Sequence, residues 1–130
     1  MKAHFLRPLL KSEGGPFRLI NERTGLPVAT TLEPAFDSAT RKRGLLGRDS
    51  LPAGHALIIA PSNMVHTFFM RFPIDILFVR RDGRVVKASA DVPARRIVGA
   101  LRGFAVIELA AGELARSQTV AGDRVTVADY

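Results

Sequence analysis

Residues 65–79 read VHTFFMRFPIDILFV and form the most apolar stretch of the chain. Pro73 divides this stretch into two segments, because proline cannot donate a hydrogen bond within a sheet. Neither alternating face of Val65–Met70 is clearly polar, so we expect a strand there that lies between two layers. In Ile74–Val79 the only charged residue is Asp75. The stretch therefore predicts two consecutive β segments that belong to the core.

Turn signals on either side of this stretch predict further short strands. Asp82-Gly83 follows Ile74–Val79 and is typical of a tight hairpin into Val85–Ala88. Short strands at fairly even spacing, separated by Gly and Pro, favour a sandwich or barrel over a parallel α/β sheet. By the same criteria we expect strands at residues 17–21, 26–30, 56–60 and 104–109, and a last strand that follows the turn at 122–123.

Helical periodicity is confined to a short segment. Apolar and basic residues recur at helical spacing between Glu33 and Leu46, and Pro34 suits a first helical turn. Gly44 and Gly47 are interpreted as a helix stop, because the proline-containing residues 49–54 do not favour a second helix. Residues 93–99 are interpreted as a basic connection, and residues 112–116 as a single helical turn. The sequence thus predicts a mainly β, jelly-roll-like sandwich or barrel with one short helix near residues 34–46.

The length of 130 residues fits a single domain. Residues 1–16 show no sustained periodicity, so we interpret them as a basic leader or arm and residues 17–130 as the β-sandwich domain. Arg7 and Pro8 interrupt the first apolar run, and no small-residue cleavage pattern follows it. No apolar stretch reaches the roughly 18 residues that a membrane span requires. We therefore expect a soluble cytoplasmic protein without a signal peptide and without a membrane partner.

The charge balance is strongly basic, and cysteine is absent. Lys and Arg number 19 against 12 acidic residues, which gives a net charge of +7 and a pI near 11.0. Such a charge permits binding to polyanions, including nucleic acids. If the protein binds them, its basic residues should form one face: Arg41, Lys42, Arg43, Arg48, Arg80, Arg81, Arg95 and Arg96. The lack of cysteine excludes disulfides, thiolate zinc sites and a cysteine nucleophile.

Six sequence blocks in order resemble a known family, the domain of unknown function 192. The blocks are Gly44–Arg48, His66–Arg71, Ile74–Phe78, Asp82–Val86, Glu108-Leu109 with Gly112, and Gly122-Asp123. The resemblance covers roughly Leu19–Val127 and implies a mostly β, jelly-roll-like sandwich with one helix near its start. Family members often have tryptophan where Phe69 stands here, and many carry an export signal that this chain lacks. The resemblance implies no activity, substrate or cofactor.

His66 and Asp75 are the first candidates for chemistry. They lie on consecutive β segments around the bend at Pro73, and a histidine oriented by a carboxylate is the geometry of a general base. The alternative is that His66 satisfies a hydrogen bond in the core while Asp75 caps a turn. No Gly-x-Ser-x-Gly motif supplies a nucleophile for such a base.

Metal ligation has weaker support in the sequence. Oxygen and imidazole ligands are available at His55, His66, Asp75, Asp91 and Glu108. The usual His-x-His pair on one strand is absent, and His4 lies in the leader. We therefore predict no metal site and no cofactor.

Glu108 is the only charged residue within the apolar segment Phe104–Leu109. A buried carboxylate must be paired or reach solvent, because transfer of an unpaired charge into the core is costly. Arg48, Arg71 and Arg102 are the partners that the sequence offers. Glu108 is either half of a structural ion pair or part of a polar pocket beside Phe69 and Met70.

The sequence leaves three functions open. The leading hypothesis is a non-enzymatic module that binds a small polar or carbohydrate-like ligand, or a partner protein. A hydrolase or isomerase that uses the His66/Asp75 pair is the first alternative, and polyanion or nucleic-acid binding is the second. The predicted pocket consists of His66, Phe69, Met70, Asp75, Glu108, Arg48 and Arg71.

Overall fold

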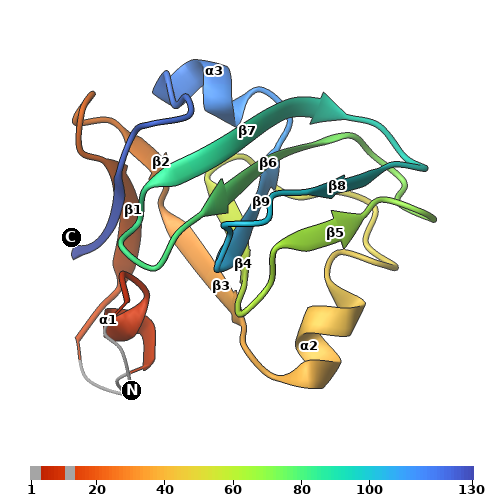
Figure 1. Ribbon diagram of the computed structural model, residues 1–130, viewed down its shortest axis with the longest axis horizontal. Coiled ribbons are helices and arrows are strands. Elements are labelled where there is room, and N and C mark those ends of the chain that lie inside the picture. The colour runs from red at the N-terminus through yellow and green to blue at the C-terminus, as the bar shows by residue number, and fades with distance from the viewer. Residues whose placement is uncertain (1–3, 11–13) are drawn as a thin grey trace.

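The computed structural model describes residues 4–10 and 14–130. This part of the chain contains ten strands and three short helices (Figure 1). The strands are β1 Phe17–Asn21, β2 Pro27–Ala29, β3 Thr31–Ala35, β4 His55–Ile59, β5 Met64–His66, β6 Ile74–Val79, β7 Val85–Val92, β8 Ile97–Gly99, β9 Ala105–Ala110 and β10 Val125–Asp129. The helices are α1 Arg7–Leu10, α2 Ser38–Arg43 and α3 Glu113–Ser117.

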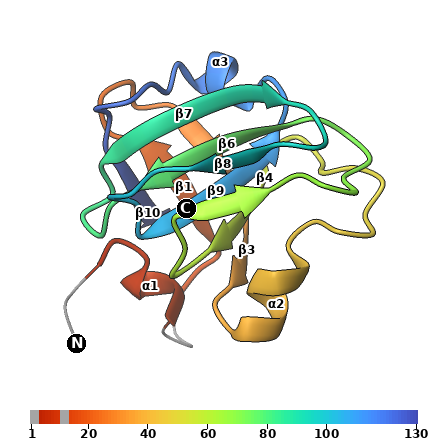
Figure 2. The same ribbon diagram turned by 45° about the vertical axis from the view of Figure 1, so that its right-hand side comes forward.

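The strands form three open sheets. A five-stranded sheet has the order β3-β4-β9-β6-β7, in which only β3 and β4 are parallel to each other. A three-stranded sheet, β10-β1-β2, and a two-stranded ribbon, β5-β8, complete the structure. Figures 1 and 2 show the ribbon and α2 on one side of the molecule and β1, β2 and β10 on another. The structure confirms a mainly β sandwich, and the open sheets exclude the closed-barrel alternative.

Alternation along β6 and β9 separates the core into two clusters on opposite faces of the five-stranded sheet. Leu77 and Leu109 belong to a cluster with Leu19 of β1 and Val127 of β10. Ile76, Phe78 and Val106 belong to a second cluster, against which Val65 of β5 and Val98 of β8 pack. All six residues of β6 are buried because both faces of this strand are covered. The prediction of a core strand at Ile74–Val79 is therefore confirmed.

The predicted strand over Val65–Met70 ends early, because β5 stops at His66. Thr67 is buried, and its hydroxyl donates to the carbonyl of Pro93 (2.6 Å) and accepts from the N–H of Arg96 (2.9 Å). A turn follows, in which the Met70 N–H donates to the Thr67 carbonyl (3.1 Å). Residues 93–99, expected as a plain connection, contain β8, which pairs with β5. Each expectation is confirmed only in part, because β5 and β8 pair over a long range and neither segment has a clear alternation of polar and apolar residues.

The predicted helix near residues 34–46 is shorter than expected. Pro34 lies in β3, at the edge of the sheet, where its missing N–H is tolerated. The helix α2 begins at Ser38, because the side chain of Asp37 accepts a hydrogen bond from the N–H of Thr40 (2.8 Å). It ends at Gly44, whose φ of 49° is in the region that favours glycine. The interpretation of Gly44 as a helix stop is confirmed.

The segment 4–10 packs onto the sandwich. Leu6 is buried in the cluster beneath the three-stranded sheet, and the Phe5 N–H donates to the carbonyl of Arg81 (2.7 Å). Residues 1–3 and 11–13 of the expected leader lie outside the described residues. Within residues 4–10 and 14–130, no helix has the length and apolar character needed to cross a bilayer.

Candidate functional site

A cavity of about 220 Å³ lies between α2, β5 and the five-stranded sheet. Its floor includes Glu108 of β9 and Ile59 of β4, and one wall is the last turn of α2 with the residues that follow it. The opposite wall comes from β5 and the turn after it. The lining residues are Arg41, Lys42, Arg43, Gly44, Leu45, Leu46, Ile59, Pro61, Ser62, Met64, Val65, His66, Met70 and Glu108.

Glu108 is the buried polar group of this cavity. Its side chain is on the same face of β9 as that of Val106, toward the ribbon, and the residue is only 4% exposed. None of the described residues donates a hydrogen bond to its Oε1 atom. Gly44 lies beside this oxygen, since a Cβ atom at that position would be 3.7 Å from Oε1. The end of α2 therefore borders the carboxyl group at van der Waals distance.

Burial raises the pKa of the Glu108 carboxyl to about 7, and the positive charge of Arg48 opposes part of this shift. Near neutral pH the group is therefore present both as a hydrogen-bond donor and as an acceptor. A buried oxygen without a partner destabilises the folded protein unless something in the cavity bonds to it. A ligand hydroxyl or amino group would satisfy Oε1.

The rim of the cavity is basic and its walls are apolar. Arg41, Lys42 and Arg43 occupy the last turn of α2, where positive charge is favoured by the helix dipole. Leu46, Val65 and Met70 cover the walls. An apolar hollow with a few directed polar groups is typical of small-molecule sites.

Asp75 is not part of this cavity. It is fully buried on the opposite face of the sheet, where Oδ1 accepts from the N–H of Asp91 (2.8 Å). Oδ2 accepts from the N–H groups of Gly112 (3.1 Å) and Leu114 (2.9 Å), which fixes the start of α3. Asp75 thus ties the end of β7 to the start of α3.

His66 lies at the surface, with its ring centroid 5.8 Å from that of Phe68. The hydrogen bonds described for Asp75 do not include His66. The structure therefore does not bring the two residues together as an acid–base pair, whereas it does place His66, Met70 and Glu108 around one cavity.

The remaining predicted pocket residues lie elsewhere. Arg48 pairs with Glu33 (3.1 Å), and this hydrogen-bonded guanidinium lowers the pKa of the Glu33 carboxyl. Arg71 pairs with Asp49 (2.6 Å) at the surface, and Phe69 is 86% exposed. Arg48 acts on Glu108 only through its charge.

Candidate metal ligands are dispersed. His55 is beside Glu33, with 3.6 Å between His55 Nδ1 and Glu33 Oε2, and Asp75 is occupied by backbone N–H groups. In the part of the chain that the structure describes, no three His, Asp or Glu side chains gather into a possible metal centre.

Sequence reasoning missed several lining residues, among them Gly44, Ser62 and Met64. The sequence indicates Gly44 only as a helix stop. That Gly44 also lines the cavity depends on which strand packs beneath the end of α2. The sequence signal that could have indicated Ser62 and Met64 is the turn Pro61-Ser62-Asn63, which directs the chain from β4 to β5.

Two of the basic runs that polyanion binding would require on one face, Arg80-Arg81 and Arg95-Arg96, lie apart from each other. Arg80 and Arg81 follow the end of β6 and, with Arg102, line a broad hollow of about 640 Å³. Arg95 and Arg96 are bonded to Thr67, which precedes the start of β6. These two groups therefore lie near opposite ends of that strand. The hollow at Arg80 contains none of the buried unpartnered atoms of the described residues, unlike the cavity at Glu108.

The chain is thus a mainly β sandwich with a cavity beside α2 whose floor includes Glu108. Residues 19–127 match the DUF192 family, described as "Uncharacterized ACR", and the chain belongs to this family. No curated protein matches the chain.

Two solved structures are similar to this fold. A candidate transcription regulator from Sinorhizobium meliloti 1021 is 25% identical, with a TM-score of 0.75 over 85% of this chain and 91% of that one. A protein of unknown function from Novosphingobium aromaticivorans DSM 12444 is 24% identical, with a TM-score of 0.72 over 87% of this chain and 90% of that one.

Proposed function

We propose that this protein binds a small polar ligand in the cavity above Glu108. The observation that carries the proposal is the Oε1 atom of Glu108, which is buried, lacks a hydrogen-bond partner among the described residues and borders the cavity. A ligand hydroxyl placed there replaces the water that the carboxyl group loses on burial.

The lining indicates the chemistry of the ligand. Three basic residues at the rim favour a negative group, and Glu108 at the floor favours a hydrogen-bond donor. Leu46, Val65 and Met70 provide apolar contact for a carbon skeleton between the two. A hydroxy acid, such as a sugar acid, carries all three features.

Binding without catalysis is the function that the geometry supports best. The His66/Asp75 mechanism needs a carboxylate that orients the imidazole, and the Asp75 oxygens are occupied by three backbone N–H groups. The Sinorhizobium protein is described as a transcription regulator, and if such a role included duplex binding it would favour a continuous basic face. The runs at Arg80 and Arg95 are separated by the length of β6.

The proposal is tested by NMR titration of the 15N-labelled protein with gluconate, with glucose as the uncharged counterpart. We expect gluconate to shift the amide signals of Gly44 and Glu108, and glucose to do so at higher concentration, because it lacks the negative group. Glu108→Gln should weaken gluconate binding, while Glu22→Gln makes the same change at an exposed site remote from the cavity lining. If neither sugar shifts these signals, or if both variants bind like the wild type, the proposal is wrong.

A further inference from the structure

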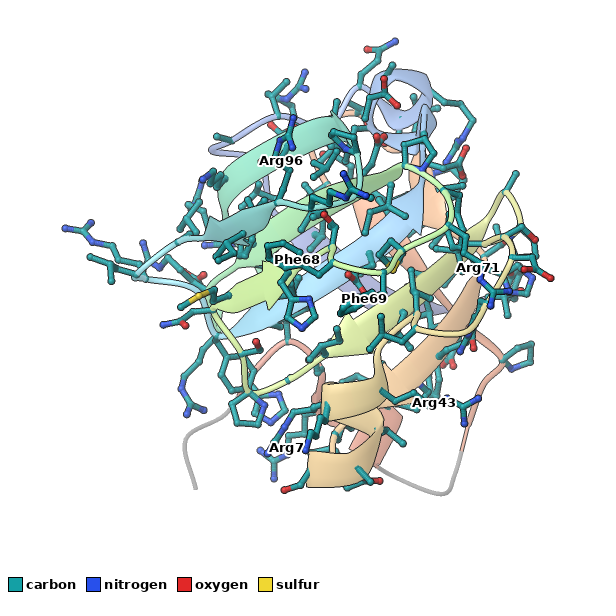
Figure 3. The ribbon with its side chains drawn as sticks, turned by 90° about the vertical axis from the view of Figure 1, so that its right-hand side faces the viewer. Arg7, Arg43, Phe68, Phe69, Arg71 and Arg96 are labelled. Atoms are coloured by element: carbon teal, nitrogen blue, oxygen red, sulfur yellow. The ribbon has the colours of Figure 1, made fainter. Side chains whose placement is uncertain are left out.

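The turn after β5 presents aromatic rings to solvent. Phe69 is 86% exposed and Phe68 is 38% exposed, and the ring of Phe68 lies next to that of His66. We refer to His66, Phe68 and Phe69 as the aromatic tip. Figure 3 shows Phe68 and Phe69 near the middle of one face of the molecule, with Arg96, Arg71 and Arg43 around them.

The backbone of this tip adopts conformations that side chains disfavour. Phe69 has a φ of 65° and Arg95, in the loop beside it, has a φ of 68°. Residues other than glycine rarely occupy this region, and they persist there only when the surrounding structure holds them. Folding alone gives no reason to keep an exposed phenylalanine in such a turn.

Thr67 holds both strained residues in place. Its carbonyl accepts from the N–H groups of Met70 (3.1 Å) and Arg95 (3.2 Å), so the turn and the neighbouring loop share one acceptor. Its N–H donates to the carbonyl of Arg96 (2.8 Å), and its buried hydroxyl adds the two bonds to Pro93 and Arg96. The arrangement is therefore fixed before any partner arrives.

The charges beside the tip are arginines. Arg95 and Arg96 are exposed, and no carboxylate of the described residues lies within ion-pairing distance of either one. Arg71 makes only an exposed pair with Asp49, which a stronger anion could replace. Guanidinium groups bind phosphates through two parallel hydrogen bonds and also stack on planar rings.

We propose that the aromatic tip and the arginines beside it, Arg71, Arg95 and Arg96, bind single-stranded nucleic acid. Bases stack on Phe68 and Phe69 while the guanidinium groups contact phosphates. Unpaired bases offer the flat faces that such stacking requires, whereas in a duplex those faces are occupied by neighbouring bases. This surface shares His66 with the ligand cavity, but Phe68, Phe69, Arg71, Arg95 and Arg96 are not among the cavity-lining residues, so changes at these positions test nucleic-acid binding separately from the ligand cavity.

An anionic bilayer is the competing partner, because exposed apolar residues with basic neighbours also bind membranes. Two features favour nucleic acid. All three charges beside the tip are arginine, although lysine would serve equally for attraction to lipid headgroups. The aromatic side chains are held by a fixed turn, which suits stacking more than insertion into a fluid interface.

The test measures binding of fluorescein-labelled dT12 by anisotropy at two salt concentrations, with a 12-bp duplex and vesicles of 30% phosphatidylserine in phosphatidylcholine as the other arms. We expect dT12 to bind more tightly than the duplex and vesicles to bind weakly. Phe69→Gly should weaken dT12 binding about 5- to 150-fold, since it removes one stacking ring. Arg96→Gln should reduce the slope of log K against log salt by about 0.7.

The controls make the same kinds of change outside the tip. Leu101→Ala removes an apolar side chain that is 97% exposed in the turn after β8, and Arg102→Gln removes a charge at the Arg80 hollow. Both should bind dT12 like the wild type. Phe69→Gly relieves backbone strain and should remain folded, so its loss of binding cannot be attributed to unfolding. Equal binding of dT12 and duplex, an unchanged Phe69→Gly variant, binding to vesicles alone, or no binding at all would each overturn the proposal.

Discussion

Asp75 and Glu108 lie on neighbouring strands of one sheet and point to opposite faces of it. In the antiparallel register of β6 and β9, Glu108 is opposite Ile76 and Asp75 is opposite Leu109. An offset of one residue reverses the direction of a side chain in a strand. The Asp75 carboxylate therefore faces the end of β7 and the start of α3, where backbone N–H groups bond to it, and the Glu108 carboxyl faces the cavity.

Asp75→Asn should strongly destabilise the protein. An amide has one acceptor oxygen in place of two, so at least one of the three N–H groups loses its partner. We expect the free energy of unfolding to fall by about 2–3 kcal/mol, measured by urea denaturation. Asp82→Asn serves as the control, since Asp82 is exposed and accepts one N–H, from Arg84. Similar losses in the two variants would show that Asp75 does not have the structural role described here.

The ionisation of Glu108 should make the protein less stable as the pH rises. Its pKa in the folded protein, about 7, is above the value near 4.5 of an exposed glutamate. Between these two values the folded state retains a proton that the unfolded state has lost, so stability falls across this range and levels off above pH 7. Glu108→Gln removes this cost, so at pH 8 the variant should be more stable than the wild type by up to about 3 kcal/mol. At pH 4 the two should be alike, and a constant difference at all pH values would contradict the assignment.

Asp123 should have the opposite effect on the pH dependence of stability. Its carboxylate accepts from Arg23 Nε (2.6 Å) and Asn21 Nδ2 (2.9 Å), and these bonds, led by the one from Arg23, hold its pKa well below the usual range. The stabilisation is present above about pH 4, the value for an exposed aspartate, and is lost as the pH falls below it. Asp123→Asn should reduce stability at pH 7 and flatten the acid limb of the stability curve. Denaturation at pH 7, 4 and 2.5 distinguishes the variant from the wild type.

Glycine at position 69 should be tolerated better than glycine at the preceding position. Phe69→Gly relieves a positive φ and removes a ring that makes little contact, so its stability should stay equal to that of the wild type or rise by up to about 1 kcal/mol. Phe68→Gly removes a ring packed near His66 and adds backbone freedom, so it should lower stability by about 1 kcal/mol. Thermal melts of the two variants make the comparison, and a loss at Phe69 as large as that at Phe68 would contradict it.

Local sequence patterns predicted the parts of the fold that depend on neighbouring residues. The hairpin at Asp82-Gly83 joins β6 and β7, and the apolar run Ile74–Val79 is a strand covered on both faces. The ribbon β5-β8 was not predicted, because it pairs segments about thirty residues apart, neither with clear alternation. Helix α2 was misplaced at its start because Pro34 suits an edge strand as well as a first turn, whereas the capping signal at Asp37 marks the true beginning.

The candidate site was only partly accessible to sequence reasoning. Glu108 stood out because a lone carboxylate in an apolar strand requires an explanation, and the structure places it at the cavity with His66 and Met70. The other predicted pocket residues lie away from the cavity, because strand register and turns decide on which face of the sheet a side chain lies. Asp75 and His66 are close in sequence, yet the bend between them and the bonds to α3 direct them apart.

Helix α2 has a kinetic consequence for the cavity. It contains no buried residue, although its last turn forms one wall. Elements with so little burial open locally at a lower free energy than the strands beneath them. The amide hydrogens of Arg41 and Gly44, which bond to the carbonyls of Asp37 and Thr40 along α2, should exchange with deuterium long before that of Ile58 in β4. A ligand bound above Glu108 would slow the exchange of Arg41 and Gly44, so protection of this short helix would report occupancy of the site.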